Sequence, residues 1–264
     1  MITLLTDFGA GSEYVGAIHA VLAAACPGHE RIDLAHDIPA GDIRRGALTL
    51  ARLAPLLPDA VHLAVVDPGV GGPRRAVVLG LASGGALVGP DNGLLAPAAE
   101  ALGVVAAVAL HPLPDGASAT FHGRDLFAPA AAALAAGARP SELGIPFDPA
   151  SLLVPDLPPP AVRPGELVAP IVAVDVFGNL QLLAGPADLA AAGFTMGDRI
   201  SAAVTDRRHP ATVCRVFADA APKGMLVHID SHGMVALAVN GGSAAQRMGA
   251  AAGQDLTLGR WTPS

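Results

Sequence analysis

Apolar runs of two different periods alternate along the first 150 residues of the chain. Residues 61–66 form a nearly continuous apolar run, which is typical of a strand that is buried on both faces. Residues 12–25 instead carry apolar side chains at helical spacing, and Ser12 stands where an N-cap is expected. Strands that alternate with helices predict an α/β domain with a largely parallel central sheet. The predicted strands are 2–7, 31–34, 61–66, 76–81, 86–88 and 104–110, and the predicted helices are 12–25, 42–54 and 124–136.

The pattern changes beyond residue 153. Residues 154–165 hold five prolines and show no apolar periodicity, which predicts a semi-rigid linker. Short β-like runs follow, separated by turn residues at regular intervals, and they predict a smaller, mostly β domain. These runs are 167–176, 199–204, 212–217, 226–229 and 234–239. We therefore expect an α/β domain at 1–153, a linker at 154–165 and a β-rich domain at 166–264.

Composition and charge exclude several classes of protein. The chain has 264 residues, of which 52% are apolar and 15% charged, and its formal net charge is −7. The acidic balance argues against a nucleic-acid binder, and no Lys/Arg run suits an anionic membrane. No uncharged apolar stretch is long enough for a transmembrane helix. Two lone cysteines and an N-terminus without a basic signal-peptide region predict reduced thiols and a cytoplasmic location.

Acidic residues stand where several predicted strands end, at Asp7, Asp67 and Asp91. Ligands of open α/β sheets bind outside the carboxyl ends of the strands, so these positions are candidates for chemistry. The glycine-rich stretch that starts at Asp67 ends in a base, Arg74. It is read either as part of a site or as a β-turn with an exposed ion pair.

A second candidate is the string Phe-His-Gly-Arg-Asp at residues 121–125, which opens the alanine-rich helix. The positive end of a helix disfavours a histidine cation, so His122 suits the role of a neutral imidazole that accepts a proton. The alternative is a surface histidine in a capping segment. For His36 and Asp37, a solvated loop is expected rather than a pH-sensitive pair.

In the second domain, one short loop carries Asp175, Phe177 and Asn179. It offers a carboxylate, an aromatic face and an amide to a ligand, or it is a plain β-turn. The segment 231–233 is likewise either a backbone nest for a ligand or a hairpin turn. No two histidines stand at ligand spacing on one strand end or one helix, so we expect no metal site.

Five strings occur in a fitting order and together resemble one family. They are Thr-Asp-Phe-Gly at 6–9, Val-Val-Asp-Pro-Gly-Val-Gly at 65–71, Pro-Asp-Asn-Gly at 90–93, Phe-His-Gly-Arg-Asp at 121–125 and Phe-Gly-Asn at 177–179. Over nearly the whole chain, the sequence is similar to the adenosine-forming S-adenosyl-L-methionine (SAM) hydrolases, also called SAM hydroxide adenosyltransferases. These enzymes are related to fluorinase and chlorinase.

The resemblance implies a fold, a reaction and an assembly. The expected fold is an α/β N-terminal domain with a barrel-like C-terminal domain. The expected reaction is attack of water or hydroxide on C5′ of SAM, which yields adenosine and L-methionine without a metal or an organic cofactor. The expected assembly is a homotrimer, with the substrate between the N-terminal domain of one subunit and the C-terminal domain of the next.

The resemblance also implies roles for individual residues. Asp67, Arg74 and His122 match the residues that handle the water in the family. Whether His122 accepts its proton or Arg74 stabilises hydroxide stays open at this point. The implied substrate contacts are Asp7 with the ribose hydroxyls, Asp175 and Ser231 with the methionine ammonium, Asn179 with the adenine, and Phe217 stacked on the adenine ring.

Two alternative functions share most of these residues. A non-catalytic protein that binds adenosine or SAM would keep the same binding groups. A halide-using SAM transferase would form 5′-halo-adenosine. However, the resembling halogenases carry tyrosine at the position of Asp67, and a carboxylate there would repel a halide ion. The strings around Asp67 and His122 follow the hydrolase pattern.

Overall fold

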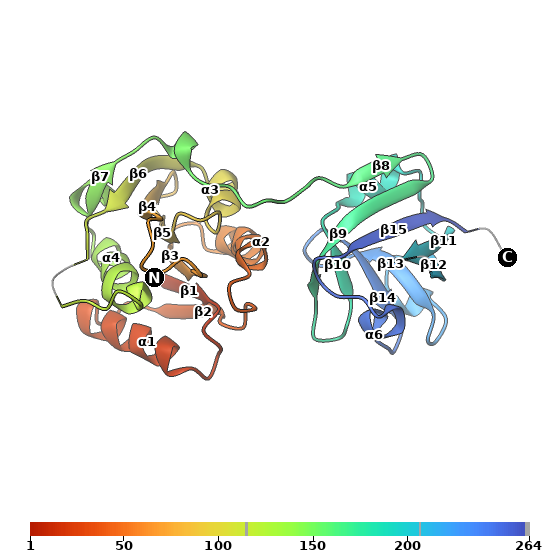
Figure 1. Cartoon of the computed structure of the whole chain (residues 1–264), viewed down its shortest axis with the longest axis horizontal. Coiled ribbons are helices and arrows are strands. Elements are labelled where there is room, and N and C mark those ends of the chain that lie inside the picture. Colours follow the sequence, from red (N-terminus) through yellow and green to blue (C-terminus); the bar gives the residue numbers. More distant parts are fainter. Residues whose placement is uncertain (114–115, 206, 262–264) are drawn as a thin grey trace. The chain divides into compact units, whose positions relative to one another are not determined.

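The computed structural model describes residues 1–113, 116–205 and 207–261. The chain divides into two compact units, Met1–Asp156 and Leu157–Ser264 (Figure 1). The division falls within the proline-rich stretch for which a linker is expected. The later part of that stretch contains a short strand, β8 (Ala161–Arg163), which pairs with the first long strand of the second unit. The limits expected for the two domains stay predictions.

The first unit is built on a seven-stranded sheet in the order β2-β1-β3-β5-β4-β6-β7. Strand β1 pairs in parallel with β2 and β3, and β3 pairs in parallel with β5. Strand β4 runs antiparallel to both β5 and β6, so that β6 points in the common direction again. The expected largely parallel sheet is confirmed, with β4 and the short β7 reversed. The strands are β1 (Ile2–Thr6), β2 (Arg31–Ala35), β3 (Val61–Val65), β4 (Ala76–Leu81), β5 (Ala86–Pro90), β6 (Val104–Leu110) and β7 (Gly144–Pro146).

Helices cover both faces of this sheet. Helices α1 (Glu13–Ala25) and α4 (Ala128–Ala135) pack against one core, and α2 (Ile43–Leu53) and α3 (Ala96–Leu102) against another. Along β3, Leu63 belongs to the first core and Ala64 to the second. Burial on both faces removes any reason for polar residues to alternate, which explains the continuous apolar run in the sequence.

The helix expected over residues 124–136 begins differently from the prediction. A single π-helical stretch, Gly123–Phe127, precedes α4, and the amide of Ala128 donates to the carbonyl of Gly123. Pro129 has no N–H to donate, and it stands within the first two positions of α4, where a missing donor costs little. Short π-helical turns are frequent at functional sites, and this one starts directly after His122.

Two buried histidines are hydrogen-bonded to threonines of β1. His62 Nδ1 lies 2.7 Å from Thr3 Oγ1, and burial lowers the pKa of His62 to about 4. His36 Nδ1 lies 2.8 Å from Thr6 Oγ1. The expectation that His36 lies in a solvated loop is wrong, because this hydrogen bond draws the ring beneath the end of β1 and leaves the residue 6% exposed.

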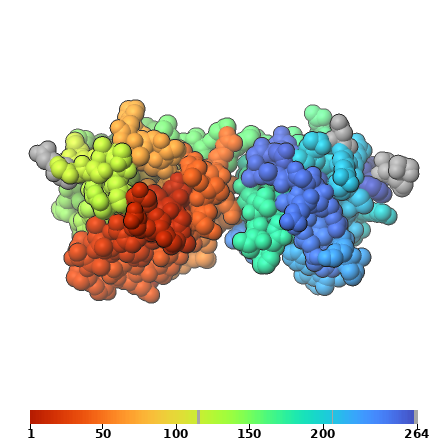
Figure 2. Space-filling view, turned by 60° about the horizontal axis from the view of Figure 1, so that its bottom comes forward, coloured from red at the N-terminus to blue at the C-terminus, as the bar shows by residue number. Residues whose placement is uncertain are grey.

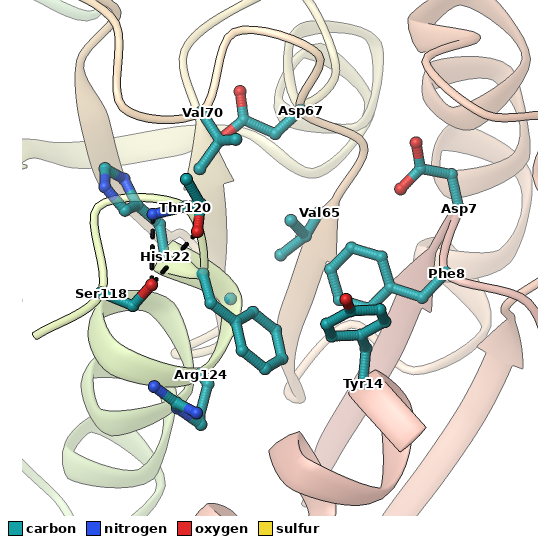
Figure 3. A pocket seen from close by; sticks show the side chains of 12 residues that line it. Asp7, Phe8, Tyr14, Val65, Asp67, Val70, Ser118, Thr120, His122 and Arg124 are labelled. Carbon is teal, nitrogen blue, oxygen red and sulfur yellow. Dashed lines mark hydrogen bonds between the residues drawn. The ribbon is translucent and has the colours of Figure 1, made fainter. Parts of the chain in front are cut away.

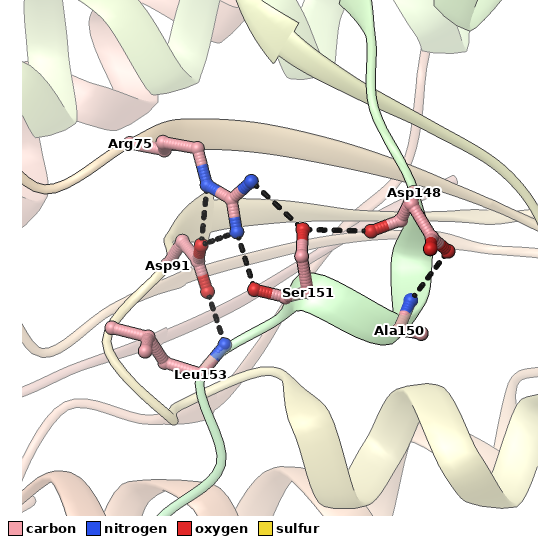
Figure 4. A network of polar contacts seen from close by, with 6 residues as sticks. All are labelled: Arg75, Asp91, Asp148, Ala150, Ser151 and Leu153. Carbon is pink, nitrogen blue, oxygen red and sulfur yellow. Dashed lines mark hydrogen bonds and ion pairs between the residues drawn. The ribbon is translucent and has the colours of Figure 1, made fainter.

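Asp91, the acidic residue that follows β5, forms hydrogen bonds that stabilise the fold (Figure 4). Its carboxylate is buried and accepts hydrogen bonds from Arg75 Nε at 2.7 Å and from the amide of Leu153 at 2.9 Å. Arg75 also donates to the carbonyl oxygen of Ser151. Asp91 and Arg75 thus attach the last segment of the first unit to the sheet, which is a structural task.

The second unit is a closed β-barrel, as expected. Its strands close in the order β9-β10-β14-β13-β12-β11-β15 and back to β9, and β8 extends the sheet beyond β9. Alternate residues of β9 are buried and form part of the interior. The elements are β9 (Glu166–Val174), β10 (Leu180–Leu182), α5 (Pro186–Ala191), β11 (Arg199–Ala203), β12 (Arg208–Val213), β13 (Met225–Ile229), β14 (Val235–Val239), α6 (Ala244–Met248) and β15 (Asp255–Arg260).

Candidate active site

A cavity of about 410 Å³ opens at the carboxyl ends of β1 and β3 (Figure 3). This is where an open α/β sheet binds its ligand. Three segments supply the walls: the end of β1 with the start of α1, the end of β3 with the loop after it, and residues 118–124. The lining residues are Asp7, Phe8, Tyr14, Val65, Asp67, Val70, Ser118, Thr120, Phe121, His122, Gly123 and Arg124.

Asp67 and Arg74 form a buried, two-pronged ion pair next to this cavity. Arg74 Nε lies 3.1 and 3.0 Å from the two carboxylate oxygens, and Arg74 Nη2 adds a further hydrogen bond to Asp67 Oδ2. The Asp67 side chain is 4% exposed and that of Arg74 10% exposed. The reading of this stretch as a turn with an exposed ion pair is therefore wrong. A fixed guanidinium of this kind can direct its remaining donors at a ligand.

Arg74 also reaches His122. Its Nη2 lies 2.8 Å from His122 Nδ1. A guanidinium has only donors, so Nδ1 must accept this hydrogen bond, and the proton of the neutral imidazole is then on Nε2. His122 Nε2 is buried and has no hydrogen-bond partner within the described residues. In this state the imidazole offers a donor, and not an acceptor, to any further ligand.

The surroundings of His122 favour its neutral form. Burial is the main cause that lowers the pKa of His122 below its ordinary value, and the charge of Arg74 lowers that pKa further. The carboxylates of Asp67 and Asp125 act in the opposite direction but do not cancel these two causes. The tautomer set by Arg74 and the lowered pKa therefore agree.

Close packing holds the two loops of this site together. Gly71 has φ +77°, and a Cβ there would lie 2.8 Å from the carbonyl oxygen of Ala119. A side chain at position 71 would push apart the loop that carries Arg74 and the segment that carries His122. That segment is closed by Asp125, whose Oδ2 accepts from the amide of Ser118 at 2.8 Å.

Three aromatic rings form a wall of the cavity. The ring centres of Phe8 and Phe121 are 6.0 Å apart, and those of Tyr14 and Phe121 are 5.1 Å apart, both edge to face. Sequence reasoning did not assign Tyr14 or Phe121 to a site. The scarcity of aromatic residues could have drawn attention to them, since the chain has only seven phenylalanines, one tyrosine and one tryptophan. However, only the fold brings Phe8, Tyr14 and Phe121 together.

Asp7 lies in the cavity with one oxygen already held. Its Oδ2 accepts a hydrogen bond from the amide of Gly41 at 2.8 Å, which fixes the carboxylate at the end of β1. In Figure 3, Asp7 and Phe8 lie on one side of the cavity and His122 on the other. The structure thus brings the strand-end acids Asp7 and Asp67 together with Arg74 and His122, the two residues that the family resemblance groups with Asp67.

The remaining predicted residues lie on the second unit. Asp175 organises the loop between β9 and β10: its Oδ1 accepts from the amides of Phe177 and Asn179, and its Oδ2 accepts from Asn179 Nδ2 at 2.8 Å. Asn179 is buried, whereas Phe177 is 75% exposed. The Phe177 ring of this loop is therefore exposed to solvent, whereas the Asp175 carboxylate is engaged in hydrogen bonds within the loop.

Phe217 and Ser231 lie on other loops of the same unit. The Phe217 ring, 41% exposed, contacts the ring of His228 at 5.0 Å between centres. Ser231 is exposed at the tip of the β13–β14 hairpin.

Gln181 links this tip to β10, because its Nε2 donates to Asp230 Oδ2 at 3.0 Å. Gln181 and His228 both pair with Ala236 and so lie in one row across β10, β14 and β13. Sequence reasoning assigned no role to either residue.

Two family models match the chain, one for each unit. Residues 2–144 match the SAM hydroxide adenosyltransferase N-terminal domain, and residues 169–257 match the C-terminal domain of the same family. The first match covers most of the α/β unit and the second most of the β-barrel. The chain belongs to the SAM hydroxide adenosyltransferase family, and the resemblance seen in the sequence strings is confirmed.

Individual relatives agree with this assignment. The chain is 48% identical to "(R)-S-adenosyl-L-methionine hydrolase" of Salinispora arenicola over 97% of both chains. It is 25% identical to "Fluorinase" of an Actinoplanes species, over 98% of this chain and 97% of that one. A crystal structure of an uncharacterized conserved protein from Thermotoga maritima superposes with a TM-score of 0.91 at 32% identity, over 98% of this chain and all of the other. In the described part of the chain, no helix combines the length and the hydropathy that crossing a membrane requires.

Proposed function

We propose that this protein hydrolyses (R)-S-adenosyl-L-methionine to adenosine and L-methionine by attack of water or hydroxide at C5′. The observation that carries the proposal is the buried Asp67–Arg74 pair hydrogen-bonded to a neutral His122 beside the cavity. Family membership and the names of the relatives at 39% to 48% identity support the same reaction.

The chemistry requires little acid catalysis. As the oxygen–C5′ bond forms, the C5′–sulfur bond breaks, and the sulfonium takes the electron pair and leaves as the neutral thioether of methionine. The protein has to place an oxygen nucleophile in line with the breaking bond and to stabilise its negative charge. The proton lost by water leaves to solvent.

Arg74 and His122 suit the task of holding a hydroxide-like oxygen. His122 presents an N–H at Nε2, and its Nδ1 is engaged by Arg74. It has no nitrogen free to accept a proton unless its hydrogen bond to Arg74 breaks. We therefore propose that Arg74 and His122 stabilise and orient the nucleophile as donors, and that Asp67 keeps the guanidinium in position.

Other residues are proposed to hold the substrate. Asp7 has a carboxylate oxygen beyond the one that Gly41 holds, and this oxygen suits the ribose hydroxyls. The assignments from family resemblance complete the proposal: Asp175 and Ser231 at the methionine ammonium, Asn179 at the adenine, and Phe217 stacked on the adenine ring. Phe177, on the same loop as Asp175, is proposed as a further aromatic contact. A homotrimer, a cytoplasmic location and the absence of a metal or cofactor from the reaction itself are parts of the same proposal.

Product analysis in oxygen-18 water tests the reaction. The purified protein is incubated with SAM, first without chloride and then with chloride, and the products are separated with mass detection. We expect adenosine that carries one heavy oxygen, together with methionine, under both conditions. Formation of 5′-chloro-adenosine would indicate a halide-using transferase, and retained adenosine without turnover would indicate a binding protein. Either result contradicts the proposal.

The lowered pKa of His122 predicts the acid limb of the pH profile. The neutral ring is the active form, because an imidazolium cannot accept the hydrogen bond from Arg74. Its pKa lies below the ordinary 6.5, so kcat/KM falls as the pH is lowered, with the midpoint of the fall below pH 6.5. The measurement is kcat/KM between about pH 5 and pH 8.

Two variants test whether the fall of kcat/KM at acid pH, the acid limb, arises from His122. His122→Gln keeps an oxygen acceptor for Arg74 but has no titration in this range, and we expect the limb to disappear. His111→Gln, at an exposed histidine outside the cavity, should keep the limb unchanged. A limb centred above pH 6.5, or one that persists in His122→Gln, contradicts the role given to His122.

A further inference from the structure

Three side chains of types that commonly bind metal ions lie together at the edge of the first unit, apart from the candidate active-site cavity. His19 is on α1, Asp33 is on the edge strand β2, and His36 follows β2. One ligand atom from each side chain lies within 4.8 Å of the other two. Among the residues that the structure describes, this is the one group of three or more His, Cys, Asp or Glu side chains with such spacing. None of the three lines the cavity.

The distances are close to those of a tetrahedral ion site. His19 Nε2 lies 2.9 Å and His36 Nε2 3.1 Å from the same oxygen, Asp33 Oδ1. Ligands about 2.1 Å from a tetrahedral Zn²⁺ are about 3.4 Å apart, so two of the three ligand separations already approach that value. The His19 side chain is 32% exposed, so it can move to adjust the third separation, which is the distance between the ligand nitrogens of His19 and His36.

His36 provides an independent indication of a ligand. Its side chain is 5% exposed, and its Nε2 atom lies 3.1 Å from Asp33 Oδ1 but makes no hydrogen bond of good geometry within the described part of the chain. Its other nitrogen, Nδ1, is held by Thr6 Oγ1 at 2.8 Å. When Nδ1 donates this bond, Nε2 carries a lone pair directed at the group. Metal-binding histidines typically show such a second hydrogen bond, which fixes the ring.

We propose that His19, Asp33 and His36 bind a divalent transition-metal ion of the zinc class, with solvent completing its coordination. Two imidazoles and one carboxylate suit Zn²⁺ and Co²⁺, whereas Mg²⁺ prefers oxygen ligands. The side chains of Asp33 and His19 are 46% and 32% exposed, so an ion has access from solvent. Figure 2 shows the N-terminal segments of the first unit, in red and orange, at the surface of the unit. The site goes beyond the proposed hydrolysis and does not depend on it.

The position of the site gives the ion a structural role. It connects α1 to β2, and the carbonyl oxygen of His36 accepts a hydrogen bond from the amide of Gly9 at 2.6 Å. Thr6, which holds His36, also accepts from the amide of Phe8. The ion thus supports the segment that carries Asp7 and Phe8 into the cavity without touching a substrate. A ligand that binds only the folded state raises stability by mass action.

Metal titration of the full chain tests the proposal. The protein is stripped with a chelator and titrated with Co²⁺, Zn²⁺ or Mg²⁺, and bound metal is measured after gel filtration. We expect one Co²⁺ or Zn²⁺ per chain, a visible absorption band with Co²⁺, and a higher melting temperature with Zn²⁺ but not with Mg²⁺. His19→Gln and Asp33→Asn should abolish these signals. Because both side chains are partly exposed, each metal-free variant should melt close to the metal-free parent.

His111→Gln is the matched control, since His111 is an exposed histidine of the same unit outside the group. It should bind metal as the parent does. Equal metal binding by His19→Gln and the parent would show adventitious binding by surface histidines and overturn the proposal. No binding by the parent would overturn it too, and would leave the group as a histidine–aspartate ion pair. None of these measurements uses SAM, so a failed hydrolysis assay does not affect them.

Discussion

Replacing Arg74 with methionine is expected to lower kcat for SAM hydrolysis by about 10²- to 10³-fold, the usual effect of removing one preorganised donor from a developing negative charge. Methionine keeps an apolar stem beside the Phe127 ring, whose centre lies 5.3 Å from the Arg74 guanidinium carbon. It removes the charge and the hydrogen bonds to Asp67 and His122. The measurement is kcat and KM for adenosine release.

The neighbouring arginine provides the control for this prediction. Arg75 pairs with the buried Asp91 and with Ser151, and within the described residues it forms no hydrogen bond or ion pair with Asp67, Arg74 or His122. Arg75→Lys should therefore reduce stability while kcat stays near that of the parent. Arg74→Lys keeps the charge but loses the planar fork that spans two partners, and its kcat should fall nearly as far as that of Arg74→Met. A kcat for Arg74→Met close to the parent value contradicts the donor role.

Asp67→Asn is expected to destabilise the first unit by about 3 kcal/mol, since removing one partner of a buried ion pair leaves the other charge uncompensated. Asparagine has nearly the same shape but offers one acceptor oxygen in place of two. Both side chains of the pair are nearly inaccessible to solvent, so water cannot replace the lost interaction. Hydrogen exchange of the amides in β1 and β3 measures the stability of this unit separately from the barrel.

The double variant separates a buried charge from a general loss of packing. Asp67→Asn combined with Arg74→Met leaves no buried charge, so it should be more stable than either single variant, with a clear coupling energy in the double-mutant cycle. The exposed Arg139–Glu142 pair of the same unit serves as the control, and its removal should change stability little. Additive effects at Asp67 and Arg74 would contradict the buried ion pair.

Much of the local structure was predictable from the sequence. The helix expected at 42–54 matches α2, because Asp42 accepts from the amide of Arg45 as an N-cap and the apolar face is periodic. The strand expected at 104–110 has the observed bounds of β6. The reversal of β4 was not predictable, because strand direction depends on pairing with β5 and β6 and not on local propensity.

For the candidate site too, the residue types were predictable from the sequence, whereas their arrangement in space was not. The family resemblance grouped Asp67, Arg74 and His122 as the residues that handle the water, but it did not give the geometry that relates them. Arg74 and His122 are 48 positions apart in the chain, and their hydrogen bond decides which imidazole nitrogen carries the proton. Three aromatic residues of the cavity wall and the burial of His36 also depend on contacts between distant segments.

The sequence by itself determined that the chain has two parts, where most of the helices and strands lie, and to which family the chain belongs. It also determined which polar residues stand at the ends of the strands. These follow from short-range periodicity and from ordered strings that need no coordinates. Only the tertiary structure decided that the Asp67–Arg74 pair is buried, that His122 Nδ1 faces Arg74, and that His19, Asp33 and His36 converge. The reason is physical: burial, tautomer and coordination geometry are set by neighbours far along the chain, and local sequence does not specify those neighbours.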